Sequence, residues 1–118
     1  MEFKLTSEQE MIRDMVRDFT ERNIKPVAAL HDEKKQFPYE NLKKMADLGL
    51  MGMNIPAEFG GSQVGVVAYS LAITEIAKGC ASHAVTTSVT SASLNCGYIG
   101  NDRIASVMRS VTGKLPLA

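Results

Sequence analysis

Carboxylates that could act as a general acid or base are scarce in the second half of this 118-residue chain. Such a group needs a pKa that a pocket has shifted. Beyond Glu58 the only carboxylates are Glu75 and Asp102. Glu75 precedes Lys78 by a spacing that favours a helical ion pair, and Asp102 suits a helix N-cap. We favour these structural interpretations, with catalysis by Glu75 as the alternative, and predict no catalytic residue.

Seven serine and threonine hydroxyls lie between residues 82 and 93. A nucleophilic hydroxyl needs an activating base, and this run has neither a nucleophile elbow nor a plausible base. Gly60-Gly61 lacks the strand-loop-helix setting and the lysine of a phosphate-binding loop, so it is only a weak candidate for an anion site. The sequence therefore predicts no cofactor-binding residue of its own.

The histidines and cysteines do not have the spacing of metal ligands. His31 and His83 fall in different predicted helices, and no CxxC motif is present. We expect His31 at the surface and His83 near a helix start. Cys80 and Cys96 are too few and too far apart for a disulfide scaffold, and we expect both to be small buried apolar residues. The sequence predicts no metal site.

Charge is balanced in total but uneven along the chain. Thirteen basic and thirteen acidic side chains cancel, which argues against nucleic acid or an acidic membrane as a partner. Residues 79–101 carry no Asp, Glu, Lys or Arg, yet their hydroxyls make them too polar for a membrane span. The N-terminus shows neither a signal peptide nor a transit pattern. We predict one domain in a cytoplasmic protein, with the uncharged stretch buried against protein.

Helical periodicity organises the first half of the chain. A capping box, either Thr6 with Gln9 or Ser7 with Glu10, predicts the start of the first helix. Its expected core face consists of Met11, Ile12, Met15, Val16 and Phe19. Pro26 is expected to end or kink this helix and to begin a second one that runs to about Lys34. A third helix is expected from Pro38 to Leu48, both residues included, with Gly49 as its left-handed C-cap.

The loop that follows, residues 48–62, mixes glycines with packable side chains, so we expect a shaped and partly buried connection. A fourth helix over residues 64–78 is apolar on most sides and should be central. Residues 82–96 contain β-branched residues that suit a strand, but the absence of alternation favours a fifth helix, ended by Gly97 and Gly100. A sixth helix is expected to begin at Asn101 or Asp102. The fold prediction is all-α, with about six helices.

Small residues recur at helical spacing in the fifth predicted helix, at Ala84, Ser88, Ser91 and Ala92. A face made of such residues allows close approach of another element or of a slender apolar ligand. Ordinary helix packing is the favoured interpretation of this face, and a ligand cavity is the alternative.

Several motifs occur in the order and spacing typical of one protein family. They are Phe3-x-Leu5-Thr6-x-Glu8-Gln9, Ile24-x-Pro26, Phe37-Pro38, Leu48-Gly49-Leu50, Ile55-Pro56-Ala57-Glu58-Phe59-Gly60-Gly61-Ser62 and Glu75-x-Ala77-x-Gly79-Cys80-Ala81-Ser82. Together they resemble the N-terminal helical domain of the acyl-CoA dehydrogenases. After Gly100 the chain departs from the lysine-rich helix that the family usually shows.

The resemblance implies an orthogonal bundle of about six helices that occupies residues 1–118. It further implies that the family's central β-domain and C-terminal helical domain, which supply the catalytic glutamate and most FAD contacts, are absent from this chain. In the family the helix that matches Ser82–Cys96 walls the acyl cavity. By position, the candidates for that wall are Ala84, Ser88, Val89 and Ala92.

The function that the resemblance implies is oxidation of an acyl-CoA to its trans-2-enoyl-CoA by a full-length FAD enzyme. That enzyme would pass electrons to an electron-transfer flavoprotein and assemble as a homotetramer, and the fragment alone would be inactive. Two alternatives remain open. One is a family relative with flavin monooxygenase or nitroalkane-type chemistry. The other is a stand-alone helical interaction module.

Overall fold

The computed structural model describes residues 2–56 and 61–98, and the regular secondary structure in these ranges is entirely helical. Its elements are α1 (Ser7–Phe19), the π-helical segment η1 (Thr20–Ile24), α2 (Lys25–Lys34), α3 (Tyr39–Asp47), the 3-10 turn η2 (Leu50–Gly52), α4 (Val66–Gly79) and α5 (Ala81–Tyr98). The all-α prediction is confirmed. The sixth predicted helix lies in residues 99–118, outside the described part, which contains five α-helices.

The first of the two possible capping boxes starts α1. The Thr6 hydroxyl accepts from the Gln9 amide at 3.2 Å, and the Gln9 side chain accepts from the Thr6 amide at 3.0 Å. Ser7 is already the first helical residue. The reciprocal pair satisfies two backbone donors that the end of a helix otherwise leaves without partners.

Pro26 changes the winding of the chain without interrupting it. The helix passes from α1 through η1 into α2, and the Lys25 amide bonds back to the Thr20 carbonyl, which closes a wide π-turn. Pro26 then occupies the first turn of α2, where its missing N–H costs nothing. The boundary predicted at Pro26 is therefore confirmed, and α2 continues directly from it.

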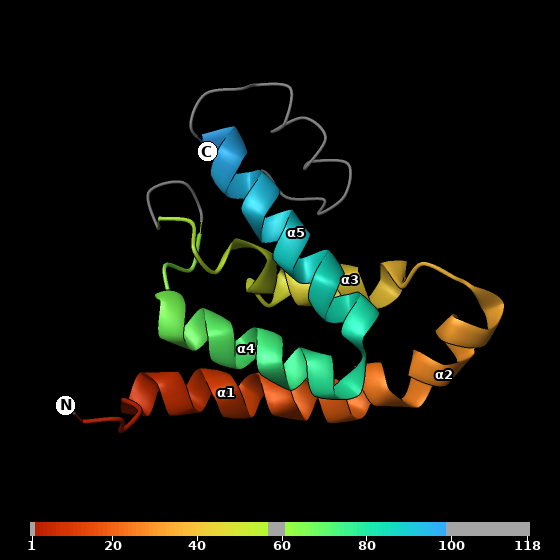
Figure 1. Cartoon of the computed structure of the whole chain (residues 1–118), viewed down its shortest axis with the longest axis horizontal. Helices are drawn as coiled ribbons and strands as arrows, with labels where there is room; N and C mark the ends of the chain where they lie inside the picture. The colour runs from red at the N-terminus through yellow and green to blue at the C-terminus, as the bar shows by residue number, and fades with distance from the viewer. Residues whose placement is uncertain (1, 57–60, 99–118) are drawn as a thin grey trace.

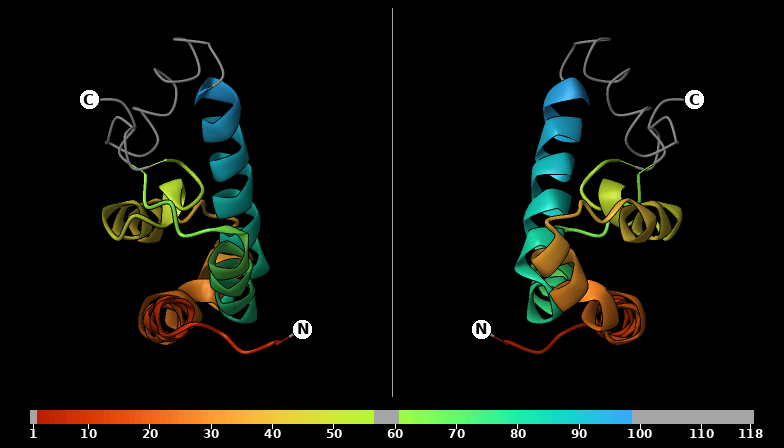
Figure 2. Two further views of the ribbon diagram at one scale, coloured as in Figure 1. Left: turned by 90° about the vertical axis from the view of Figure 1, so that its left-hand side faces the viewer. Right: turned by 90° about the vertical axis from the view of Figure 1, so that its right-hand side faces the viewer.

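Helices α1 and α4 lie side by side and run in the same direction, and α5 leaves the end of α4 and rises across α3 and η2 (Figures 1 and 2). Gly79, the last residue of α4, makes the close approach to η1 possible. A β-carbon there would collide with the Thr20 methyl group and stand 3.2 Å from the Ile24 side chain. Only a residue without a side chain fits this crossing.

One apolar core joins α1, η1, α3, η2, α4 and the start of α5. Its buried members are Val16, Phe19, Ile24, Leu42, Met45, Ala46, Leu50, Met51, Met53, Ala72, Ile76 and Ala84. The predicted core faces were too broad. Met11 and Met15 of the predicted face of α1 are exposed, and so are Val66 and Val67 at the start of α4. A helix that packs on one neighbour buries a narrower stripe than its full apolar face.

Outside residues 57–60, the loop before α4 is partly buried, as predicted. Gly49 adopts the left-handed conformation with φ of 80°, and its carbonyl accepts from the Ser62 hydroxyl at 3.1 Å. Ile55 is buried, and the Val64 amide donates to the Met53 carbonyl at 2.9 Å. These contacts hold Ser62 and Val64 against the segment around η2.

Candidate functional site

Helix α5 is the element that the family resemblance assigns to the wall of a ligand cavity. Its hydroxyls explain how part of an uncharged polar helix can be buried. Thr86 and Thr87 each donate to the carbonyl one turn earlier, at 2.8 Å. Ser91, also buried, donates to the Met51 carbonyl at 3.1 Å and so fastens α5 to η2. Because these hydroxyls have acceptors within the fold, their burial carries no large desolvation cost. The helix prediction is confirmed, and α5 continues past Gly97 to Tyr98.

The four wall candidates do not share one environment. Ala84 is only 5% exposed and belongs to the core, and Ser88 is half-buried. Val89 is 59% exposed, and Ala92 is exposed as well. The residue that completes the outward stripe with Val89 and Ala92 is Val85, one turn earlier and also exposed. Sequence reasoning missed Val85, although its i−4 spacing from Val89 was a sufficient signal.

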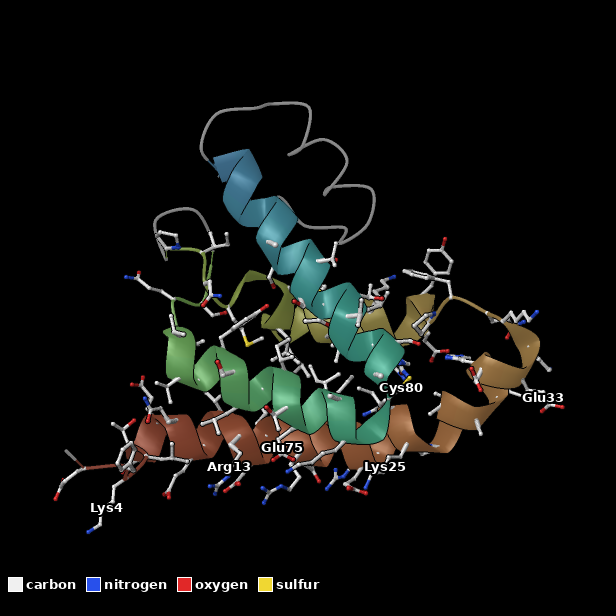
Figure 3. The ribbon with its side chains drawn as sticks, in the orientation of Figure 1. Lys4, Arg13, Lys25, Glu33, Glu75 and Cys80 are labelled. Atoms are coloured by element: carbon white, nitrogen blue, oxygen red, sulfur yellow. The ribbon has the colours of Figure 1, made fainter. Side chains whose placement is uncertain are left out.

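Glu75 is the one carboxylate on the central helix α4, and its role is structural: it is a buried anion paired with two cations (Figure 3). It accepts from the Arg17 guanidinium of α1 at 3.1 and 3.2 Å and from the Lys78 ammonium at 2.8 Å. Hydrogen bonding to Arg17, reinforced by Lys78 against the opposing effect of burial, lowers the pKa of Glu75 to about 2.

A general base must have a pKa near the working pH, so Glu75 is a poor one. The predicted pair with Lys78 is confirmed. Arg17 was not predicted, since no local spacing connects it to Glu75.

Two histidines that are far apart in the sequence meet between α2 and α5. The rings of His31 and His83 stack with centroids 6.0 Å apart and an interplanar angle of 11°. His83 lies near the start of α5, as predicted, and is 1% exposed. The expectation that His31 is a surface residue was wrong: it is half-buried, because the start of α5 covers it. Burial, and then the proximity of His31, lowers the pKa of His83.

Within the described ranges, no group of three or more His, Cys, Asp or Glu side chains could hold a metal ion. Cys80 has a free thiol and is half-buried, less than the predicted full burial, because it lies at the bend between α4 and α5 (Figure 3). Cys96 lies in the part of α5 whose side chains are not described. None of the helices in the described ranges has the length and apolarity needed to span a bilayer.

The fold and the site together define an all-α domain with a half-exposed, uncharged helix as its candidate ligand surface. Residues 6–103 match the family model of the acyl-CoA dehydrogenase N-terminal domain. The chain thus belongs to the acyl-CoA dehydrogenase family, as its N-terminal domain.

Proteins with similar sequences include short-chain specific acyl-CoA dehydrogenases. The chain is 48% identical over 80 residues to the short-chain specific acyl-CoA dehydrogenase of Clostridium acetobutylicum, covering 68% of this chain and 21% of that protein. It is 43% identical over 97 residues to the mitochondrial short-chain enzyme of Bos taurus, covering 82% of this chain and 23% of that protein. The acryloyl-CoA reductase (NADH) of Anaerotignum propionicum is 48% identical over 80 residues, which cover 68% of this chain and 20% of the reductase. The chain therefore spans about a fifth of the length of these relatives.

Solved structures give the same fold. The butyryl-CoA dehydrogenase of Megasphaera elsdenii superposes with a TM-score of 0.69 at 33% identity, covering 75% of this chain and 24% of that one. A chain from a structure on the electron transferring flavoprotein of Acidaminococcus fermentans gives a TM-score of 0.72, also at 33% identity, covering 75% of this chain and 23% of that one. The family is FAD-dependent.

Proposed function

We propose that this chain forms part of an FAD-dependent acyl-CoA dehydrogenase that converts a short acyl-CoA to its trans-2-enoyl-CoA. FAD would accept the hydride, and an electron-transfer flavoprotein-type acceptor would take the electrons onward. Family membership and the short-chain relatives support this proposal. The catalytic glutamate and the FAD contacts would come from a central β-domain and a C-terminal helical domain, in a cytoplasmic homotetramer.

The described part of α5 does not fit FAD itself. From Ala81 to Ala92 it carries no Lys or Arg side chain, the groups that pair most strongly with a diphosphate. An uncharged helix with exposed small side chains instead suits the apolar acyl chain of a thioester. No step of the reaction is assigned to residues of this chain.

The observation that carries the proposal is the outward stripe of α5. We propose that Ala84, Ser88, Val89 and Ala92 wall one side of the acyl cavity. Val89 and Ala92 would make the direct contact because they are exposed, and Ser88 would lie at the edge. Ala84, at 5% exposure, would support the wall from the core side. In this role the chain excludes water from the acyl group and limits its length.

The test uses protein expressed from the full reading frame, as wild type and with Val89→Phe. An anaerobic visible spectrum is recorded before and after addition of butyryl-CoA and longer thioesters, and kcat/KM is measured with a dye acceptor. We expect flavin bleaching by a short thioester. Since a pocket discriminates by roughly 10–200-fold per methylene, Val89→Phe should lower kcat/KM for hexanoyl-CoA at least about ten-fold relative to butyryl-CoA.

The matched control is Val67→Phe, which enlarges a half-exposed valine on α4. It should leave the ratio of the two kcat/KM values unchanged. If both variants change the ratio equally, or neither does, the wall assignment fails while the dehydrogenase proposal stands. If the flavin stays oxidised with every thioester, the dehydrogenase proposal fails in favour of other flavin chemistry. A colourless protein would favour the interaction module.

A second candidate function is the reverse reaction, reduction of a 2-enoyl-CoA. The 48% identity to acryloyl-CoA reductase (NADH) favours it as strongly as the dehydrogenase relatives favour oxidation. Consumption of NADH with acryloyl-CoA as the only electron acceptor separates the two directions.

A further inference from the structure

His83 is a buried titratable side chain that the proposed acyl wall does not use. Its ring is 1% exposed, lies at the start of α5 and reaches two elements that are distant in the sequence. It stacks on His31 of α2, with ring centroids 6.0 Å apart, and its Nε2 atom lies 3.3 Å from the amide nitrogen of Asn41 on α3. His83 therefore connects the start of α5 to both α2 and α3.

The hydrogen bonds of Asn41 determine where the proton of neutral His83 resides. The Asn41 amide nitrogen donates to the Asn23 carbonyl at 2.8 Å, which identifies this nitrogen as the NH₂ group. The same nitrogen faces His83 Nε2. Two donors cannot face each other, so Nε2 is the acceptor and the ring proton resides on Nδ1. The contact between α3 and α5 is thus a hydrogen bond between neutral groups.

A second proton on His83 does not fit this arrangement. It would bind to Nε2, where the new N–H would face the NH₂ group of Asn41 as donor against donor. Asn41 cannot turn its amide oxygen toward the ring, because its NH₂ group would then leave the Asn23 carbonyl and the two oxygens would face each other. The Nδ1 atom is buried and has no partner among the described residues, so no acceptor stabilises the cation on that side.

The charged groups around the ring do not favour a positive charge on it. Those that line the cavities beside His83, His31 and Asn41 are Arg22 of η1, Asp32 and Lys35 of α2, and Glu40 and Lys44 of α3, with the Cys80 thiol at the bend before α5. The cations outnumber the carboxylates on these linings. The Asp32 carboxylate is exposed, and Glu40 pairs with Lys44. On α4, the carboxylate of Glu75 is bound by Arg17 and Lys78.

The pKa of His83 agrees with this environment. Burial lowers it from the ordinary histidine value of 6.5, and the proximity of His31 lowers it further. Acid therefore favours any conformation that hydrates the ring. Movement of the start of α5 away from α2 and α3 would do so, and only Cys80, in an extended conformation, separates α5 from α4.

We propose that His83 is a pH-sensitive latch: the neutral ring holds the start of α5 against α2 and α3, and the protonated ring releases it. The rest of α5 stays in place, because Ser91 donates to the Met51 carbonyl at 3.1 Å further along the helix. The latch requires no particular substrate or reaction.

The direction and size of the response follow from linkage. In the open state the ring is hydrated and binds a proton near pH 6.5, whereas in the closed state it does so only at lower pH. The closed state is therefore fully stable above about pH 6.5 and loses stability as the pH falls. Between about pH 7.5 and about pH 5.5, the equilibrium constant for opening should rise about ten-fold.

Hydrogen–deuterium exchange measured by mass spectrometry on protein expressed from the full reading frame reports this opening. Labelling times are adjusted for the effect of pH on the chemical exchange rate. The amides of residues 84–88 in α5 should show the ten-fold rise, and those of residues 10–14 in α1 should not change. The absence of a rise in α5 would overturn the proposal. An equal rise in α1 would also overturn it, because acid would then unfold the whole domain.

Two histidine variants assign the response to one ring. His83→Gln removes the titrating group, whereas its amide oxygen can still accept from Asn41, so this variant should show no rise. His31→Gln is the matched control: it changes the stacked ring but keeps the contact between Asn41 and Nε2, so the rise should remain. A rise that disappears in His31→Gln and persists in His83→Gln would refute the role of His83.

Asn41→Asp tests the conflict between donors and decides the matter even if His83→Gln does not fold. A carboxylate oxygen in place of the NH₂ group accepts from a protonated Nε2, so acid should hold the start of α5 more tightly. Opening in this variant should stay constant or decrease between about pH 7.5 and about pH 5.5. A rise as large as in the wild type would contradict the latch.

Discussion

Replacing Glu75 with glutamine should destabilise the fold in a way that depends on pH. The substitution keeps the shape of the side chain and removes the negative charge that connects α1 to α4. Glu75 is almost completely buried, whereas its partners Arg17 and Lys78 have side chains that are 49% and 58% exposed. Glu75→Gln therefore removes a buried anion, while its partners Arg17 and Lys78 stay partly hydrated.

The pKa of Glu75 gives the magnitude. A decrease from 4.5 to about 2 corresponds to about 3 kcal/mol of preference for the charged form. Water around the two half-exposed cations screens part of this interaction, so we expect a loss of about 1–2 kcal/mol at neutral pH. For a domain of this size, such a loss lowers Tm by roughly 4–12 °C.

The sign of the pH dependence follows from linkage. Because the pKa of Glu75 is lower in the folded chain than in the unfolded one, the unfolded chain binds more protons between the two values. The stabilisation is complete above about pH 4.5 and is lost as the pH falls toward 2. The difference in the free energy of unfolding between wild type and Glu75→Gln should shrink over the same interval.

Urea unfolding followed by far-ultraviolet circular dichroism, repeated from neutral pH to about pH 3, measures this difference. The control is Glu40→Gln, which breaks an ion pair with Lys44 at 3.1 Å in which the glutamate side chain is 85% exposed. It should cost less than about 0.5 kcal/mol. A Glu75→Gln effect as small as the control, or one that does not change with pH, would refute the electrostatic argument.

Three further substitutions test the packing. Gly79→Ala should destabilise by about 1–3 kcal/mol, because its β-carbon collides with η1. Gly52→Ala, whose nearest contact would be 3.6 Å, should show no such loss in a thermal melt. Ser91→Ala should lower the free energy of unfolding by about 1 kcal/mol, because a buried carbonyl of η2 loses its donor. The wild type should therefore unfold more slowly in urea than this variant. Thr6→Ala should cost about 0.5–2 kcal/mol, and Ser7→Ala much less, since Thr6 is the N-cap. Equal losses for Thr6→Ala and Ser7→Ala in circular dichroism melts would contradict this assignment.

Local sequence signals were sufficient to predict an interaction wherever the interacting groups are close in the chain. The capping box at Thr6, the left-handed Gly49 and the pair of Glu75 with Lys78 all involve residues within one helical turn or one backbone conformation. Their physical chemistry is complete within a few residues, so type and spacing predict them. The family followed from motifs of the same kind, read in order along the chain.

Contacts between distant segments could not be read from the same patterns. Arg17 and Glu75 meet because α1 and α4 run side by side, and His31 stacks on His83 because α5 begins beside α2. An apolar face of several residues leaves the rotation of a helix uncertain by tens of degrees. That uncertainty decides which of two adjacent residues is buried, as Val16 and Met15 demonstrate.

The sequence by itself determined that the chain is helical, where most of its helices begin and end, and which family it belongs to. The tertiary structure decided which side chains those helices bring together. It exposed Val89 and buried Ala84 on the same helix, and it left the Nδ1 atom of His83 buried without a hydrogen-bond partner among the described residues. The reason is that helix formation depends on neighbours in the chain, whereas burial and pairing depend on the crossing of whole helices, which only the packed core fixes.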